Sequence, residues 1–291
     1  MVKSDYRRKV ERFFHSRLGY NVMNDPDQYN YIEALIKPAK ELQAVFVDAP
    51  AGTGKTSIAL AAAYYLMEMK QISKIMYVRN TVALRENGFL PGTQEEKEMV
   101  YMRPLKENID RIAARDKEKD LFERWINEGK LEAVSTSYIR GTDIDDDVFI
   151  LVDEAQNLSI PELQGVLTRK HDSVKIAVVG SHLQVDTPNI QRFGLKGLLP
   201  FEVYMDHFCN QQTKIPVQRC ELTINYRGEF AQHADSIQQT INKYNQQITT
   251  KREIEQEHRN TPESVMDLWE GIMHLTEGEQ KQLKGLVGSF D

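Results

Sequence analysis

The sequence predicts an α/β fold with a mostly parallel sheet flanked by helices, followed by a small helical C-terminal extension. Between residues 42 and 224, short apolar runs alternate with polar or helical segments, a rhythm typical of parallel α/β sheets. Two of these runs, "DVFILV" and "KIAVVG", are apolar at both sets of alternating positions, as expected of central strands covered on both faces. With 291 residues, the chain can form one sizeable domain and an accessory piece.

The apolar runs and the segments between them indicate individual elements. The expected strands are "QAVFVDA", "KIMYVRN", "LEAVSTS", "DVFILVDE", "VKIAVVGS" and, with the weakest pattern, "VQRCELTI". Helices are clearest in "KTSIALAAAYYLMEMK" and in "KEKDLFERWINEGK", which ends at Gly129, a residue type common after helices. Strands and helices therefore alternate as an α/β core requires.

We expect three parts along the chain. Residues 1–23 form a basic helical segment, 24–228 the α/β domain, and 229–291 a helical extension for oligomerisation or partner binding. The basic residues of the first segment suit either a solvated helix face or a nucleic-acid contact.

Within the extension, a long polar helix and two shorter helices are expected. Thr261 with Pro262 predicts the start of one short helix, and Thr276 has capping-box spacing at the start of the other. An apolar stripe at helical spacing favours packing or an oligomer contact over chemistry. It consists of Val265, Leu268, Trp269 and Ile272.

Composition and charge exclude several classes of protein. The formal net charge of -6 argues against a protein that coats duplex nucleic acid through bulk positive charge, although a local basic groove remains possible. No apolar run is long enough for a membrane span, and the N-terminus is too charged for a signal peptide. We expect a cytoplasmic protein with no membrane partner. Two cysteines without metal-ligand spacing indicate neither a disulfide framework nor a zinc site.

The stretch "APAGTGKT", residues 49–56, has the pattern of a phosphate-binding loop with Ala49 in place of the first glycine. An apolar strand enters it and an alanine-rich helix leaves it, which is the context that this motif requires. Lys55 is expected to reach the β and γ phosphates of a nucleotide, and Thr56 to ligate Mg²⁺. The predicted ATP contacts of this loop are Ala51, Gly52, Thr53, Gly54, Lys55, Thr56 and Ser57.

Two further strand ends carry catalytic candidates. In "VFILVDEAQN", Asp153 can hold the Mg²⁺ shell, and Glu154 can polarise a water for attack on the γ phosphate. In "KIAVVGSHLQVD", Gln184 can donate to the γ phosphate or orient that water. The predicted cofactors are therefore ATP and Mg²⁺.

Six motifs together resemble one family. The segments "APAGTGKT", "VRN" with "GFLPG" and "YMRPL", "YIRG", "VDEAQN", "LTRK" and "GSHLQVD" stand in the order found in the PhoH-like ATPases, which are relatives of superfamily-one helicases. The resemblance spans about residues 24 to 198. It implies a RecA-like P-loop core, ATP hydrolysis and a link to RNA or single-stranded nucleic acid. By position it makes Gln28 the adenine reader, with Tyr31 beside it.

The sequence departs from this family's pattern at a few positions. Asn80 stands in place of the usual proline, and the segment before "GFLPG" is one residue shorter. Ser181 replaces an aspartate near the metal and the sensor, which bears on the rate or coupling of hydrolysis rather than on ATP binding.

The resemblance also implies an incomplete cleft, because superfamily-one helicases close ATP between two RecA-like lobes and this chain has sequence for one. We expect a ring-like homo-oligomer such as a hexamer, in which a neighbouring copy supplies an arginine in trans. Arg227 in "NYR" is the leading candidate, and a surface salt bridge is the alternative for it. The other candidates are Arg140, Arg192 and Arg219.

Aromatic and basic residues near the motifs predict a single-stranded nucleic acid as partner, because bases stack on such side chains. The candidates are Arg79, Asn80, Thr81, Phe89, Tyr101, Arg103, Tyr138 and Arg140. The leading hypothesis is an ATPase that remodels or unwinds RNA or single-stranded DNA. A nucleotide-dependent binding switch with little turnover and, less favoured, a small-molecule kinase remain as alternatives.

Overall fold

A computed structural model of the chain describes residues 7–79, 94–136, 139, 144, 147–187, 189–210, 214–237, 240–241, 243–245, 247–248 and 265–287. For residues 94–101, 265, 266, 286 and 287 it describes the backbone alone. Contacts divide the chain into two units, residues 1–235 and 236–291. Helix α9, Glu229–Asp235, therefore belongs to the first unit, although its sequence lies in the expected extension.

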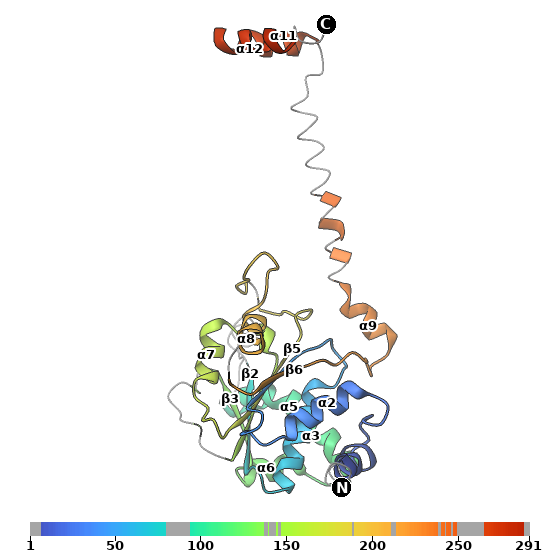
Figure 1. Cartoon of the computed structure of the whole chain (residues 1–291). Coiled ribbons are helices and arrows are strands. Elements are labelled where there is room, and N and C mark those ends of the chain that lie inside the picture. Colours follow the sequence, from blue (N-terminus) through green and yellow to red (C-terminus); the bar gives the residue numbers. More distant parts are fainter. Residues whose placement is uncertain are drawn as a thin grey trace. The chain divides into compact units, whose positions relative to one another are not determined.

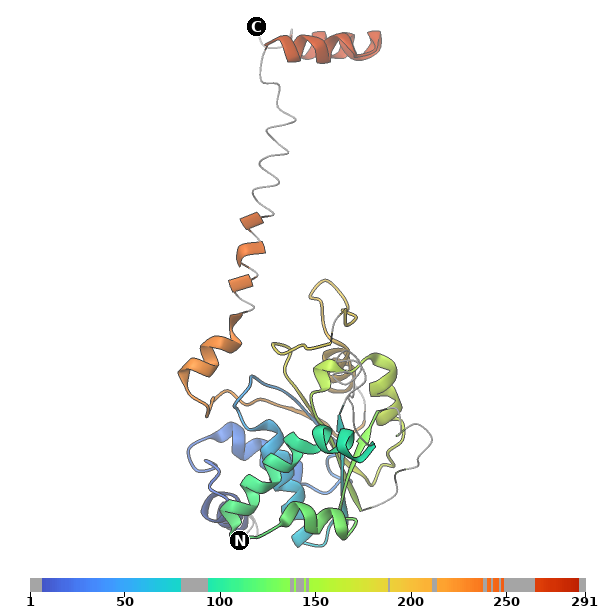
Figure 2. The ribbon, with the colours of Figure 1, turned by 180° about the vertical axis from the view of Figure 1, so that it is seen from behind.

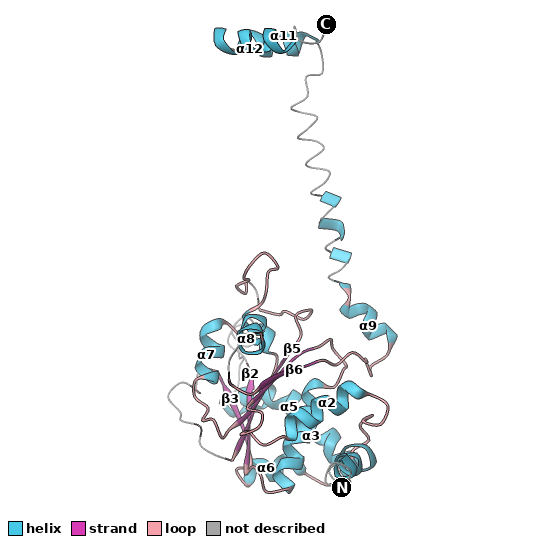
Figure 3. Cartoon of the chain, viewed as in Figure 1, coloured by secondary structure: helices cyan, strands magenta, loops and turns pink. Residues whose placement is uncertain are grey.

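The first unit contains a six-stranded sheet in the order β3-β2-β4-β5-β1-β6 (Figures 1 and 3). Every pairing between these strands is parallel. The strands are β1 Ala44–Asp48, β2 Lys74–Arg79, β3 Leu131–Ser135, β4 Val148–Val152, β5 Lys175–Gly180 and β6 Val217–Cys220. All six expected segments form strands, and the fold is the α/β class with a parallel sheet flanked by helices that the sequence predicts.

Helices cover both faces of the sheet, as Figures 1 and 2 show from opposite sides. One face packs against π-helix η1 and helices α2, α3, α5 and α6 through a core that includes Phe14, Ile58 and Trp125. The other face packs against α7 and α8 through a second core that includes Leu163 and Phe201. The bounds are η1 Glu11–Arg17, α2 Pro26–Ile36, α3 Lys55–Glu68, α5 Gln94–Asp116, α6 Leu121–Asn127, α7 Ile160–Leu167 and α8 Pro200–Cys209.

The central strands and the helix after the first strand have the burial that their sequences predict. In β5 all six residues are buried, and in β4 four of five are. Helix α3 buries ten residues, because alanine allows close approach of a helix to a sheet. The predicted covering of both faces is therefore observed.

The N-terminal segment packs into the same core instead of forming a separate part. Phe13 lies edge to face with Tyr65, with 5.0 Å between the ring centroids. Arg17, one of the basic residues of this segment, forms ion pairs with Glu68 and Asp116. This arginine therefore contacts its own chain.

The second unit contains α11, Val265–Met273, and α12, Glu277–Val287. The expected capping box is present, because the hydroxyl and the backbone N–H of Thr276 both donate to Glu279. Leu268 and Trp269 of the apolar stripe are 51% and 62% exposed. The expected start at Thr261 lies outside the described residues. In the part of the chain that the structure describes, no helix has both the length and the apolar character needed to cross a membrane.

Candidate nucleotide-binding site

A cavity of about 510 Å³ lies where the parallel strands end, beside the predicted phosphate loop. Crevices at the carboxyl ends of such strands are the usual ligand sites of α/β sheets. The lining includes twelve of the predicted residues, namely Gln28, Ala51, Gly52, Gly54, Lys55, Thr56, Ser57, Arg79, Asp153, Glu154, Gln184 and Arg227. Residues that are far apart in sequence thus meet in one pocket.

The phosphate loop connects β1 to α3 through two glycines in left-handed conformations. Gly52 has φ +80° and Gly54 has φ +89°, which residues with a Cβ rarely adopt. A Cβ at Gly52 would also lie 2.6 Å from Asn225 Oδ1. Both glycines are therefore needed for the shape of the loop, which presents the start of α3 to the cavity.

Ala49 takes the place of the first glycine without strain. Its N–H donates to Gly180 O at 3.1 Å, which continues the pairing of β1 with β5. Its side chain is 2% exposed and belongs to the core. The position is a strand continuation with room for a methyl group, so alanine fits there.

The two predicted Mg²⁺ ligands lie next to each other. Thr56 Oγ1 donates to Asp153 Oδ1 at 2.8 Å, and Tyr77 donates to Asp153 Oδ2 at 2.8 Å. Asp153 is 4% exposed, and burial, followed by the charge of Glu154, raises the pKa of its carboxyl group. A buried carboxylate beside a hydroxyl is an oxygen donor set that suits Mg²⁺, so these residues fit the ion.

Glu154, the expected water-activating residue, follows Asp153 with a left-handed backbone conformation, φ 54°. Such a conformation at a non-glycine residue is uncommon and occurs often at functional sites. Its Oε2 accepts from Gln156 Nε2 at 2.6 Å, and its Oε1 lies 3.8 Å from Arg79 Nη2. Its carboxylate is thus held by two neighbouring side chains.

Gln184 lines the cavity, as predicted, and its carbonyl oxygen accepts from Gln156 Nε2 at 2.8 Å. Ser181, three residues before it, is 1% exposed, and its Oγ has no hydrogen-bond partner among the described residues. Lys55 is buried, and its Nζ lies 3.5 Å from Pro50 O. Thr53 does not line the cavity, because its hydroxyl turns to Pro50 O at 3.0 Å.

A hydrogen-bonded group around Gln28 also contributes to the lining of the cavity. Its Oε1 accepts from Asn21 N–H at 3.0 Å, and its own N–H donates to Asp25. Tyr226 donates to Asp25 at 2.7 Å and so joins the same group. Tyr31, expected beside Gln28, is fully buried and donates to Lys55 O at 3.2 Å, so it supports α3.

The "NYR" segment contacts the phosphate loop of its own chain. Asn225 Nδ2 donates to Ala51 O at 2.8 Å, and Tyr226 N–H donates to Gly52 O at 2.9 Å. Arg227 follows and lines the cavity. Arg227 therefore lies at the cavity of its own chain, and its expected action in trans on a neighbouring copy stays a prediction.

The predicted nucleic-acid residues are placed only in part. Arg79 lies at the cavity beside Glu154. The side chain of Arg103 is 79% exposed and pairs with Glu107 on α5. The positions outside the described residues are Asn80, Thr81, Phe89, Tyr138 and Arg140, together with the side chain of Tyr101.

Several lining residues lie outside every motif quoted from the sequence. They are Gly19, Tyr20, Asn21, Glu107, Asn108, Arg111 and Arg115. Pro104 of "YMRPL" and Tyr226 of "NYR" also line the cavity. Tyr20 donates to Ser57 O at 3.0 Å, and the guanidinium of Arg115 lies 5.1 Å from the centre of the Tyr20 ring. The only signal for Tyr226 was its place in "NYR".

Fold, phosphate loop and cavity together define a P-loop protein with an α/β core built on a parallel sheet. The chain belongs to the PhoH-like protein family, whose model matches residues 22–212.

Two curated relatives illustrate this membership. The PhoH-like protein of Mycobacterium leprae is 32% identical over 193 residues, covering 66% of this chain and 54% of the relative. The PhoH-like protein of Bacillus subtilis is 34% identical over 169 residues, covering 58% of this chain and 50% of the relative. The chain thus spans about half the length of the curated relatives it matches.

Among solved structures, the large terminase of a thermophilic bacteriophage in complex with ADP is similar over 68% of this chain and 45% of that chain. The two are 11% identical, with a TM-score of 0.39.

Proposed function

We propose that the protein hydrolyses ATP with Mg²⁺ and couples hydrolysis to binding of RNA or single-stranded DNA. The observation that carries the ATPase proposal is the 2.8 Å hydrogen bond between Thr56 and Asp153, with Lys55 and Glu154 lining the same cavity. A P-loop ATPase needs these four groups together, because they bind phosphates, hold the metal and activate water.

Each residue has a role in this proposal. Lys55 and the loop N–H groups bind the phosphates, and Thr56 and Asp153 hold Mg²⁺, which supplies charge that offsets the negative phosphates. Glu154 orients a water and accepts its proton as the water oxygen bonds to the γ phosphorus and the bond to ADP breaks. Arg227, which lines its own chain's cavity, offsets charge on the γ phosphate.

Measurement of phosphate release tests the ATPase proposal. The wild type should release phosphate from ATP only with Mg²⁺, and Glu154→Gln should keep ATP binding while turnover falls at least about a hundredfold. Wild-type protein that binds ATP without turning it over would contradict the proposal.

A second candidate, a nucleotide-dependent binding switch with little turnover, is favoured by one observation. The Glu154 carboxylate is already engaged by Gln156 at 2.6 Å and faces Arg79 at 3.8 Å. If this arrangement persists with ATP bound, part of the Glu154 carboxylate is occupied, and fewer of its lone pairs are free to accept a proton from water. The same assay separates the candidates, because a switch binds ATP tightly and releases almost no phosphate.

The nucleic-acid part of the proposal is supported by two described arginines. Arg79 ends β2 at the cavity, and Arg103 exposes its guanidinium on α5, which also lines the cavity. A strand that contacts α5 could therefore influence the nucleotide site. Single-stranded RNA should stimulate phosphate release, and single-stranded DNA is the comparison ligand.

Arg103→Ala tests this surface, with Arg124→Ala on α6 as a matched control. Both arginines are exposed and form an ion pair with a glutamate of their own chain, Glu107 for Arg103 and Glu118 for Arg124. Arg103→Ala should weaken RNA binding and its salt dependence, and Arg124→Ala should not. Equal effects of both variants would indicate nonspecific charge attraction.

We also infer a homo-oligomer, a ring such as a hexamer. The described residues contain one α/β sheet with its cavity at one edge, and a neighbouring copy could cover that edge. Native mass measured with and without ATP tests this, and a monomer with full activity would contradict it.

A further inference from the structure

The turn that carries Gln184 is fixed on two sides by side chains from neighbouring strands. This turn, Ser181–Gln184, follows β5 directly and is closed by a hydrogen bond from Gln184 N–H to Ser181 O at 3.0 Å. In the sheet, β5 lies between β4 and β1. The ends of those two strands therefore flank the turn.

On the β4 side, the fixing residue is Gln156, which is fully buried. Its Oε1 accepts from Ser181 N–H at 3.0 Å, and its Nε2 donates to Gln184 O at 2.8 Å and to Glu154 Oε2 at 2.6 Å. One amide thus joins both ends of the turn to the carboxylate proposed to activate water.

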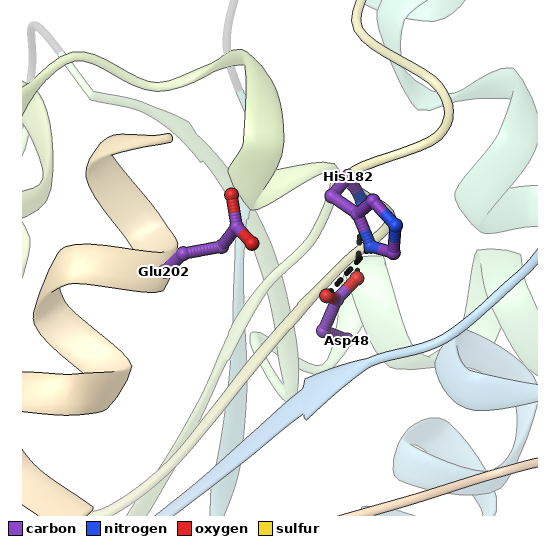
Figure 4. Close-up of side chains that lie close together, drawn as sticks. All are labelled: Asp48, His182 and Glu202. Carbon is purple, nitrogen blue, oxygen red and sulfur yellow. Dashed lines mark hydrogen bonds and ion pairs between the residues drawn. The ribbon is translucent and has the colours of Figure 1, made fainter. Parts of the chain in front are cut away.

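On the β1 side, Asp48 binds His182 through both of its oxygens, as Figure 4 shows. His182 N–H lies 3.0 Å from Asp48 Oδ1, and His182 Nδ1 lies 2.8 Å from Asp48 Oδ2. The Asp48 side chain is 7% exposed. Because Asp48 is the residue before the phosphate loop, this pair joins the base of that loop to the turn that carries Gln184.

The surroundings of His182 raise its pKa. The hydrogen bond to Asp48 is the largest cause, burial acts in the opposite direction, and the charges of Asp48, Glu202 and Asp235 add to the rise. Glu202 lies within the same cluster, where its Oε2 accepts from Leu199 N–H at 2.8 Å. Among the described residues, Glu202 forms no hydrogen bond to the turn, so the direct link on this side is made by Asp48.

We propose that Asp48 and His182 are positioning residues that hold Gln184 at the γ-phosphate end of the cavity. This inference rests on the proposed ATP hydrolysis and deepens it. A bond to the main chain and a bond to the side chain of one residue fix both its place and its orientation. An amide that must meet a γ phosphate or a water loses much of its effect when displaced by about 1 Å.

A double-mutant cycle tests whether Asp48 acts through Gln184. Asp48→Ala should lower kcat roughly ten- to hundredfold and leave the Kd for ADP within about twofold. In a Gln184→Ala background, Asp48→Ala should cause little further loss, because its effect runs through Gln184. Equal losses in both backgrounds, or equal weakening of ADP and ATP binding, would overturn the inference.

Conservative variants give a second readout. His182→Ala should lower kcat, and His182→Asn should recover part of it, because an asparagine amide can still donate toward Asp48. Glu202→Gln is the comparison variant, and it should lower kcat much less than His182→Ala, because Glu202 forms no hydrogen bond to the turn among the described residues. Equal losses of kcat in Glu202→Gln and His182→Ala, or no difference between the two His182 variants, count against the proposal.

This inference can be tested even if the proposed function fails. If the wild type shows no turnover, the ATPase proposal fails. The inference is then judged from two measurements that Asp48→Ala should change, namely the preference for ATP over ADP and amide exchange at residues 181–184.

A metal site at this cluster is the alternative to a positioning role. Binding of one Zn²⁺ or Mn²⁺ that is lost in both His182→Ala and Glu202→Gln would identify such a site and overturn the positioning role.

Discussion

Thr56 Oγ1 and Asp153 Oδ1 lie 2.8 Å apart, although 97 residues separate them in sequence. The phosphate loop brings Thr56 to the first turn of α3, and the end of β4 brings Asp153 to the same point. The Thr56 hydroxyl thus satisfies one oxygen of a buried carboxylate, whose other oxygen accepts from Tyr77. This pair is the centre of the candidate Mg²⁺ site.

Asp153→Asn should abolish the effect of Mg²⁺ on nucleotide binding without unfolding the protein. The asparagine can still accept from Thr56, but it carries no charge to hold the cation. Phosphate release should fall at least about a hundredfold. Binding of a fluorescent ATP analogue, measured with Mg²⁺ and with EDTA, checks this. Tyr77→Phe, which removes only the hydrogen bond to Asp153 Oδ2, should have a smaller effect.

Arg227→Ala should lower turnover, and mixing experiments should show that Arg227 acts on its own chain's nucleotide. When Arg227→Ala is mixed with Glu154→Gln, a cis arginine leaves every site defective, so the mixture stays inactive. An arginine supplied in trans would instead create intact sites between the two kinds of subunit. Recovery of activity on mixing would contradict the cis arrangement seen beside Gly52.

Gly52→Ala should weaken nucleotide binding at least about tenfold. The new Cβ would lie 2.6 Å from Asn225 Oδ1 and 2.9 Å from Arg227 Cγ, so the "NYR" segment must move. Gly129→Ala is a matched control, because Gly129 also has positive φ, +67°, with no atom within 4 Å of the added Cβ. Both variants should lose about 1–2 kcal/mol of unfolding free energy, but only Gly52→Ala should affect binding, as measured by calorimetry.

Lys175 predicts a pH dependence of stability. Its Nζ is buried and donates to Ala34 O at 2.7 Å and Leu42 O at 2.6 Å. Burial lowers its pKa from 10.5 to about 7. Between these values the unfolded chain binds a proton that the folded chain lacks, so raising the pH favours the folded state.

The contribution of Lys175 to the unfolding free energy should therefore rise by up to about 1.4 kcal/mol per pH unit above pH 7. In Lys175→Met, this contribution to the dependence of the unfolding free energy on pH should disappear. The variant should also be less stable, because the carbonyl groups of Ala34 and Leu42 lose their donor. Urea denaturation between pH 7 and 9 checks the difference. Parallel pH profiles for the two proteins would show that Lys175 stays charged in the fold.

Local sequence patterns were enough for the strands and for the loop. A continuous apolar run such as Val148–Val152 can only be buried on both sides, and the spacing of Gly52, Gly54 and Lys55 specifies a phosphate loop within eight residues. These local signals also predict that the reactive side chains of the motifs lie close together, because parallel strands end at one edge of the sheet.

The remaining walls of the cavity depend on contacts that no local pattern encodes. Asn225 donates a hydrogen bond to Ala51, which is 174 residues away in sequence. Arg115 extends from α5 to the cavity, where its guanidinium lies over the ring of Tyr20. The side chains of Asn225 and Arg115 are polar and would suit a solvated surface equally well. Their roles emerge only when the packing of helices and loops is known.

Asp235, the last residue of α9, accepts a hydrogen bond from Ala51 N–H at 3.0 Å. One donor of the phosphate loop is thus already bonded to a carboxylate. If a triphosphate uses that donor, its binding is an exchange of one anion for another on a fixed amide, so its net affinity reflects a difference between two attractions. Asp235 of α9 and the nucleotide would then compete for the same N–H group of Ala51.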